Sequence, residues 1–339
     1  MKVAFFQFYP PTLWNLGGGE TMLLKTKEYL EKGYDINIEL FDIWSRKKDY
    51  DIMHIFGSSY HHYEFAKIAK ELGMKIVLSS IAYSPKPKIY WQAWKQIDKL
   101  IPIDTTYTLR KKLYNLADVI IANSEVEKVQ QSEYFDTPLS KFEVIHLGGD
   151  IRFSKASKTE FENKYGISNY ILCVARINPR KNQIRLIEAL KGTGIPLVFI
   201  GPPDHKYPKY IEEFINKVKE TDNVLWIEHI DHNSTLLASA YKGARVHVNV
   251  ARGEFPGLCS IEAGLAGINV VAVKDPTVYE YLKDYVIYCD PDDIISIKES
   301  VMNAYNSNKS MELQRHLIQN HTWQVVAEKT YRVYKNILK

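Results

Sequence analysis

Short apolar runs alternate with amphipathic stretches along the chain. In the first half the runs are rich in β-branched and aromatic residues, which is typical of buried strands: KVAFFQF, DINIELFDI, YDIMHIF, MKIVLSS, DVIIANS and FEVIHL. The stretch 20–32 between the first two runs carries Met22, Leu23, Tyr29 and Leu30 at helical spacing. Strands separated by helices predict βαβ units and a parallel sheet.

The same alternation starts again after a polar stretch, GGDIRFSKASKTEF, that has no clear period. Five further strand-like runs follow it: YILCVAR, IPLVFIG, NVLWIE, ARVHVNV and INVVAV. We therefore expect two doubly wound α/β domains, 1–155 and 165–320, each binding ligands at the carboxyl ends of its strands. Two such sheets facing each other would form a cleft. The last segment, 321–339, is an amphipathic helix that could pack on its own domain or back on the N-terminal one.

Length and composition limit the class of protein. A chain of 339 residues is too long for one core, and 45% hydrophobic with 25% charged residues is typical of a globular protein. A net charge of +4 is too small to indicate nucleic acid as a partner. Three cysteines without paired spacing indicate neither a disulfide framework nor a zinc site. The first apolar run reads as a strand rather than a signal peptide, so we expect a cytoplasmic protein.

A glycine cluster, Gly17–Gly19, follows the first strand-like run and precedes a predicted helix. Glycine lets the backbone approach a ligand closely, and a helix N-terminus presents free N–H groups to an anion. The spacing matches neither G-x-G-x-x-G nor a P-loop. A tight connection between strand and helix is the alternative interpretation.

The stretch VARINPRKN places two cations directly after a strand. Arg176 lies at the carboxyl end of that strand, and Lys181 lies at the start of the next helix. A guanidinium and an ammonium beside a helix N-terminus can hold a diphosphate. Two solvated surface charges are the alternative.

Two carboxylates bracket a turn and an apolar run in EFPGLCSIEAG. Glu254 lies just past a strand, whereas Glu262 lies about one turn inside the predicted helix. If a diphosphate bound at the N-terminus of this helix, each of the two acids would lie close to one of the two groups attached to the diphosphate. Because a carboxylate accepts several hydrogen bonds, the pair could bind polyols on both sides. The alternative is a helix-capping Glu and an exposed loop Glu.

The order of these motifs resembles that of the retaining glycosyltransferases of family 4, which have the GT-B fold and belong to the glycosyltransferase-1 superfamily. The E-x7-E motif of that family is matched by EFPGLCSIEAGLAGINVV, with Glu254 and Glu262 in register. Further matches lie along almost the whole chain: GGGE at 17–20, VIHLGGD at 144–150, Arg176 with Lys181-Asn182, IGPPD at 200–204 and HTWQVVAEKTYRVY at 321–334.

The resemblance implies a role for each motif. Glu262 would hold the ribose of a nucleotide-sugar donor, and Glu254 would contact the transferred sugar. Arg176 and Lys181 would neutralise the leaving diphosphate, in a front-face reaction that retains the anomeric configuration. The remaining donor-binding positions are mostly backbone contacts at helix starts and strand ends: Gly18, Gly19, Asn182, Gly201, Gly257 and Leu258.

The sequence departs from the family pattern in two places. Many relatives carry a sugar-contacting histidine after the fourth strand of the N-terminal domain, but KIVLSSIAYSP has none. Ser79, Ser80 or the nearby His54 could take its place, and His54 could equally be a hydrogen-bonded histidine at the end of a strand. Phe255-Pro256 replaces Gly-Phe between the two acids. The identity of the donor sugar is therefore not inferred from the resemblance to the family. No convincing D-x-D motif occurs, and we expect neither a metal nor another cofactor.

Residues 84–114 combine seven basic and two acidic residues with Tyr90, Trp91 and Trp94. This composition suits an anionic membrane surface on the inner face of the membrane, or a lipid-phosphate acceptor. A helix pair with a solvated basic face is the alternative.

We therefore predict a hexosyltransferase that moves a sugar from a nucleotide sugar to a saccharide or lipid-linked acceptor in glycan assembly. The alternatives are a sugar-nucleotide epimerase or phosphorylase of the same fold, and a two-domain sugar-binding protein without chemistry.

Overall fold

The structure is a computed structural model, which describes residues 1–8, 17–45, 47–84, 86–100, 103–253 and 257–339. It divides into two compact units. The first comprises Met1–Leu147 together with Trp323–Lys339, and the second comprises Gly148–Thr322.

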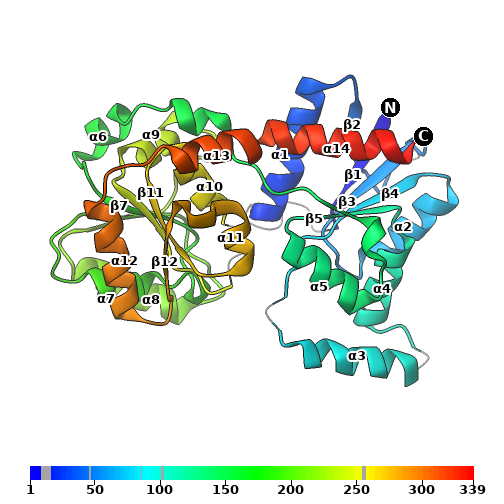
Figure 1. The fold of residues 1–339 in the computed structure, drawn as a ribbon, viewed down its shortest axis with the longest axis horizontal. Coiled ribbons are helices and arrows are strands. Elements are labelled where there is room, and N and C mark those ends of the chain that lie inside the picture. The colour runs from blue at the N-terminus through cyan, green and yellow to red at the C-terminus, as the bar shows by residue number, and fades with distance from the viewer. Residues whose placement is uncertain (9–16, 46, 85, 101–102, 254–256) are drawn as a thin grey trace. The chain divides into compact units, whose positions relative to one another are not determined.

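The first unit is a parallel six-stranded sheet in the order β2-β1-β3-β4-β5-β6, with helices on both faces (Figure 1). Its elements in chain order are β1 (Lys2–Phe6), α1 (Gly18–Gly33), β2 (Asn37–Leu40), β3 (Ile52–Phe56), α2 (His62–Glu71), β4 (Lys75–Ser79), α3 (Lys88–Leu100), α4 (Thr106–Leu116), β5 (Val119–Ala122), α5 (Glu125–Phe135), the 3-10 turn η2 (Leu139–Lys141), β6 (Phe142–Val144) and, from the end of the chain, α14 (Trp323–Ile337).

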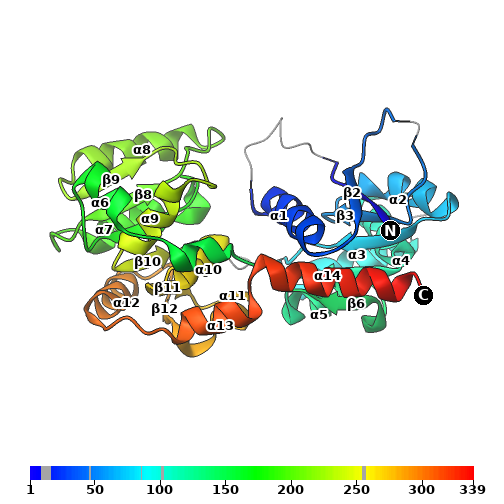
Figure 2. The same ribbon diagram turned by 90° about the horizontal axis from the view of Figure 1, so that it is seen from above.

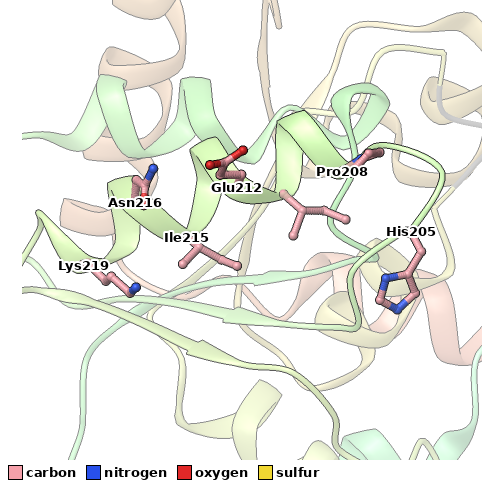
Figure 3. Close-up of a pocket in the computed structure, with 7 residues that line it drawn as sticks. His205, Pro208, Glu212, Ile215, Asn216 and Lys219 are labelled. Carbon is pink, nitrogen blue, oxygen red and sulfur yellow. The ribbon is translucent and has the colours of Figure 1, made fainter.

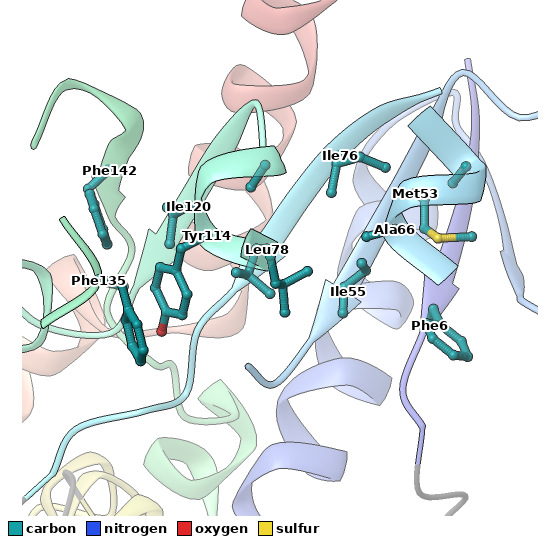
Figure 4. Packing of buried hydrophobic residues seen from close by; sticks show 14 of the residues in the cluster. Phe6, Met53, Ile55, Ala66, Ile76, Leu78, Tyr114, Ile120, Phe135 and Phe142 are labelled. Atoms are coloured by element: carbon teal, nitrogen blue, oxygen red, sulfur yellow. The ribbon is translucent and has the colours of Figure 1, made fainter. Parts of the chain in front are cut away.

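One face of this sheet packs under α2, α4 and α5. Figure 4 shows inward side chains of successive strands, such as Phe6, Ile55, Leu78 and Ile120, in one cluster with Phe135 of α5. All five residues of β3 are buried, because helices cover both faces of a parallel sheet. This explains why the inner strands of this unit appear in the sequence as continuous apolar runs rather than alternating ones.

The last helix, α14, belongs to the first unit. It runs beside α1 in Figures 1 and 2, and the Tyr331 ring stacks on Tyr34 at 4.1 Å between centroids. Its Tyr334 side chain reaches the sheet and contacts His54 of β3. The final helix therefore completes the second face of the N-terminal sheet.

The second unit repeats the architecture, with a parallel sheet in the order β12-β11-β10-β7-β8-β9. Its elements are η3 (Ile151–Lys155), α6 (Thr159–Tyr165), β7 (Ile171–Val174), η4 (Pro179–Lys181), α7 (Gln183–Leu190), β8 (Leu197–Ile200), α8 (Pro208–Lys219), β9 (Val224–Ile227), α9 (Thr235–Gly243), β10 (Val246–Asn249), α10 (Leu258–Leu265), β11 (Asn269–Val273), α11 (Pro276–Leu282), η5 (Lys283–Tyr285), β12 (Ile287–Cys289), α12 (Ile294–Asn306) and α13 (Glu312–Asn320).

The chain changes unit earlier than the predicted boundary at 155, namely between Leu147 and Gly148. The reason is the segment η3, which packs against α9 and α10 of the second unit. Phe153 of η3 is fully buried there, with its ring 5.3 Å from that of Tyr241. Phe153 and Phe161 are both fully buried, but they stand in a polar stretch without periodicity, which does not indicate their burial.

Among the described residues, no helix is both long enough and apolar enough to cross a membrane.

Candidate functional site

The second unit brings two distant loops together at the carboxyl edge of its sheet. The strands β7, β8 and β9 follow one another across the sheet in chain order. The chain then crosses over, and β10 pairs with the opposite side of β7. Open α/β sheets bind ligands at such a switch point. The loop after β7 and the loop after β10 meet there: Arg252 donates its backbone N–H to the carbonyl of Arg180 at 2.8 Å.

The N-terminus of α10 lies in the second of these loops. Gly257 precedes the helix and Leu258 is its first residue, as predicted from the sequence, and no side chain in the described part of the chain caps this end. Its first-turn N–H groups are therefore suited to an anion. Glu254 lies outside the described residues.

Glu262 is in the second turn of α10, with 6% of its surface exposed. Its Oε2 accepts a hydrogen bond from Tyr241 Oη at 2.8 Å, and its Oε1 lies 2.6 Å from His232 Nε2. Burial, and then the adjacent carboxylate, raise the pKa of Tyr241 well above its usual range, so this hydroxyl keeps its proton and donates. Two partners leave further lone pairs on the carboxylate for hydroxyl groups of a ligand.

A second layer of contacts fixes this carboxylate. Arg152 of η3 donates to the backbone carbonyls of His232 and Ser234, and the Phe153 ring lies against both His232 and Tyr241. Sequence reasoning found neither His232 nor Tyr241. Their contact with Glu262 depends on how α9 packs against α10, and no spacing in the sequence indicates it.

Arg176 and Lys181 lie in the loop that follows β7. The guanidinium of Arg176 is 4.0 Å from Asp204, at the outer limit of an ion pair. The backbone N–H of Lys181 donates to the Asn178 side chain at 3.0 Å, which fixes the 3-10 turn that carries the ammonium. Burial, and in addition the charge of Lys181, lower the pKa of His247 in β10 to about 3, so this imidazole is neutral.

Asn182 and Gly201, both expected at the donor site, have structural roles here. Asn182 adopts a left-handed conformation and its amide donates to the carbonyls of Pro291 at 2.8 Å and Val250 at 3.5 Å. Gly201 has a φ of +149°, and a Cβ at this position would lie 2.2 Å from the carbonyl oxygen of Ala175. Both residues hold the loops in place.

In the first unit, Gly18 and Gly19 open α1. The carboxylate of Glu20 caps this helix by accepting the backbone N–H of Gly17 at 2.9 Å, and Gln7 donates to the same carboxylate at 3.1 Å. The glycine cluster therefore lies at a helix start beyond the first strand, as predicted. Its contact with a donor stays a prediction.

The predicted sugar contacts His54, Ser79 and Ser80 are interior groups. His54 is 1% exposed, with Nδ1 2.5 Å from Tyr334 Oη and Nε2 2.8 Å from Ser79 Oγ. Burial lowers its pKa to about 3, so it is neutral. Ser80 donates to Glu127 at 2.5 Å. The interpretation of His54 as a hydrogen-bonded strand histidine is therefore correct, and the three side chains are not placed to bind sugar.

A groove of about 380 Å³ runs along α8. In Figure 3 its labelled side chains come from this helix and the loop before it, with His205 at one end and Lys219 at the other. All lining residues lie within 205–219, and the loops that follow β7 and β10 contribute none. We therefore place the candidate site at the strand ends and not in this groove.

Residues 154–322 match the family model of the glycosyl transferases group 1. No curated protein matches the sequence.

Several solved structures match nearly the whole chain. HepE of Anabaena in complex with UDP-glucose has a TM-score of 0.77 at 16% identity, covering 99% of this chain and 100% of its own. A glycosyltransferase of Rickettsia africae has a TM-score of 0.74 at 15% identity, covering 100% and 98%. Sucrose-phosphate synthase of Thermosynechococcus elongatus has a TM-score of 0.74 at 14% identity, covering 99% and 98%. Together with the two parallel sheets, these similarities confirm the predicted GT-B fold.

Proposed function

We propose that the protein transfers a hexose from a nucleoside diphosphate sugar to an acceptor hydroxyl, because residues 154–322 match the family model of the group 1 glycosyl transferases. The acceptor is a saccharide or a lipid-linked saccharide, and the anomeric configuration is retained. UDP-glucose is the first donor to test, since HepE binds it.

The observation that carries this proposal is the arrangement of unlike charges at the β7–β10 junction. The N-terminus of α10, which no described side chain caps, and the two cations Arg176 and Lys181 suit a diphosphate, whereas the Glu262 carboxylate suits a polyol. A nucleoside diphosphate sugar carries both groups side by side. As the bond to the sugar breaks, negative charge grows on the diphosphate, and fixed cations and amides stabilise it.

The proposal is tested with the full chain and a panel of UDP-, GDP- and ADP-sugars. Release of the nucleoside diphosphate together with formation of a glycoside supports it, and NMR of the product gives its anomeric configuration. An epimerase would return the nucleotide sugar with altered stereochemistry. If no donor is turned over and none raises the melting temperature, the proposal fails.

Glu262→Gln is expected to weaken binding of the bare nucleoside diphosphate about ten- to a hundredfold. The reason is the loss of a charged acceptor for the ribose, since a hydrogen bond to a charged group contributes about 1.5–3 kcal/mol. The ribose does not change during the reaction, so turnover should fall less than affinity. Calorimetric titration measures the affinity.

Glu254→Gln is the matched comparison, because the second acid is assigned to the transferred sugar. It should leave binding of the diphosphate nearly intact and slow the transfer. The assignment is wrong if Glu254→Gln abolishes diphosphate binding while Glu262→Gln retains it.

Turnover is expected to persist in excess EDTA. Two cations and a helix N-terminus take the place of a metal ion, and among the described residues no three His, Cys, Asp or Glu side chains gather closely enough to hold one. Initial rates after dialysis against chelator, with and without added Mg²⁺ or Mn²⁺, measure this. Loss of turnover that either ion restores would contradict metal independence.

A further inference from the structure

The first unit contains a hollow of about 380 Å³ at the carboxyl edge of its sheet. It is lined by the loop after β4 together with parts of α3 and α4, and the side chains that matter here are Lys86, Tyr90, Trp91, Trp94, Tyr107 and Arg110. Arg110 is tied to the end of β3, since its Nε donates to the carbonyl of Ser58 at 2.8 Å. Pockets for small ligands have volumes of about 300–1,000 Å³.

The hollow has a concentration of positive charge. Its lining contains Lys86 and Arg110 and no acidic residue. In the described part of the chain neither cation forms an ion pair, although the lysines around them do: Lys88 with Glu133, Lys95 with Asp136, Lys111 with Asp98 and Lys112 with Asp104. Four of the seven basic residues of 84–114 are thus paired with acids, whereas the two cations that line the hollow form no ion pair with a described residue.

Aromatic groups supply the walls and further hydrogen-bond donors. The Lys86 ammonium lies 3.9 Å from the centre of the Tyr90 ring. It lowers the pKa of that phenol, with smaller contributions from Trp94 and Arg110, so these four groups converge. Trp91 is 8% exposed, and its buried indole N–H has no hydrogen-bond partner among the described atoms.

We propose that this hollow binds the acceptor as a saccharide that carries a phosphate group. A phosphate monoester has a charge of about −1.5 to −2 and three strong acceptor oxygens, which suits the two cations Lys86 and Arg110. The flat walls formed by Trp94 and Tyr90 suit the apolar face of a sugar ring. The assignment as acceptor site rests on the proposed function, whereas the binding of phosphate does not.

Binding is measured directly on the full chain. Glucose 1-phosphate and glucose 6-phosphate are the probes, with glucose and inorganic phosphate beside them, and tryptophan fluorescence and calorimetry are the readouts. We expect at least one sugar phosphate to bind, and glucose to bind at least about tenfold more weakly because it lacks the charged group.

Two variants test the lining, and a third serves as the control. Lys86→Gln and Arg110→Gln should each weaken the sugar phosphate about tenfold or more, because each removes a charged donor. Lys99→Gln is the matched control, since Lys99 lies on α3 outside the hollow and should have no effect. Lys86 is exposed, so its variant stays informative if Arg110→Gln fails to fold.

Vesicles of phosphatidylcholine with and without phosphatidic acid distinguish the source of the phosphate. If the protein binds the phosphatidic acid vesicles, and Lys86→Gln and Arg110→Gln abolish this binding, the phosphate belongs to a lipid. If the protein binds only the free sugar phosphates, the phosphate belongs to a soluble acceptor. The proposal is overturned if neither probe binds, or if Lys86→Gln binds as well as the wild type. Affinity for the nucleoside diphosphate, measured in the same variants, reports on the second unit separately and should not change.

Discussion

Lys181→Met is expected to lower the turnover number by about 100- to 1,000-fold, the usual cost of removing one preorganised group that stabilises transition-state charge. The ammonium is assigned to the leaving diphosphate, whose negative charge grows as the sugar departs. Affinity for the diphosphate product should fall as well, because the released product carries this negative charge in full.

The loop that carries Lys181 should survive this substitution. Its 3-10 turn is fixed by bonds of the backbone, from Lys181 N–H to Asn178 Oδ1 and to the Asn178 carbonyl, both at 3.0 Å. Steady-state kinetics at saturating donor, with circular dichroism as a check on folding, measure the effect. Lys191→Met serves as the control, since Lys191 is an exposed lysine at the end of α7. Turnover of Lys181→Met close to that of the wild type would remove Lys181 from the site.

All strands except β12 were predicted, in their order of appearance, from short apolar runs. The three residues of β12 (Ile287–Cys289) form too short a run to be recognised in the sequence. The spatial order of the strands was not predictable, since nothing in VHVN of β10 indicates that it pairs with β7 rather than with β9. That crossing is what brings Lys181 and Glu262 to one edge. The resemblance to a family supplied it, and hydrophobic periodicity could not.

The orientation of His54 shows a second limit. In a half-exposed strand, alternation tells which side chains point inward. Both faces of β3 are covered, so its neighbours Met53 and Ile55 are as buried as His54 itself, and the pattern carries no information about direction. The partners of His54 are Ser79 and Tyr334, and the second of these comes from the far end of the chain.

Glu262 shows a third limit, at the level of side-chain contacts. Its spacing from Glu254 predicted an acid inside α10, and the structure places it there. The two donors that hold it, His232 and Tyr241, come from the loop before α9 and from α9 itself. Tertiary packing alone determines these contacts. Sequence reasoning therefore identified the acid but not the two side chains that form hydrogen bonds with it.

Gly201→Ala is expected to destabilise the protein by about 2–6 kcal/mol, as the sum of a strained backbone and a steric clash, each about 1–3 kcal/mol. A Cβ here would lie 2.2 Å from the carbonyl oxygen of Ala175. The obstacle is backbone and cannot rotate away. It lies between hydrogen bonds that join β7 to β8 and β8 to β9, from Ala175 N–H to the Ile200 carbonyl and from Gly201 N–H to the Ile227 carbonyl, both at 3.0 Å.

A matched control separates the cost of the strained backbone from the cost of the steric clash. It also distinguishes a role of Gly201 in strand packing from a role in the approach of the donor. Gly192 has a φ of +78°, and no atom lies within 4 Å of the place that a Cβ would take there. Gly192→Ala therefore carries the backbone strain without the clash and should cost about 1–2 kcal/mol. Urea unfolding of the full chain measures both variants. If glycine at 201 serves only the approach of the donor, Gly201→Ala will unfold like the wild type and lose affinity for the diphosphate. If Gly201 serves strand packing, as its close approach to the Ala175 carbonyl indicates, Gly201→Ala will lower the free energy of unfolding. Any loss of affinity for the diphosphate would then result from displacement of the loop.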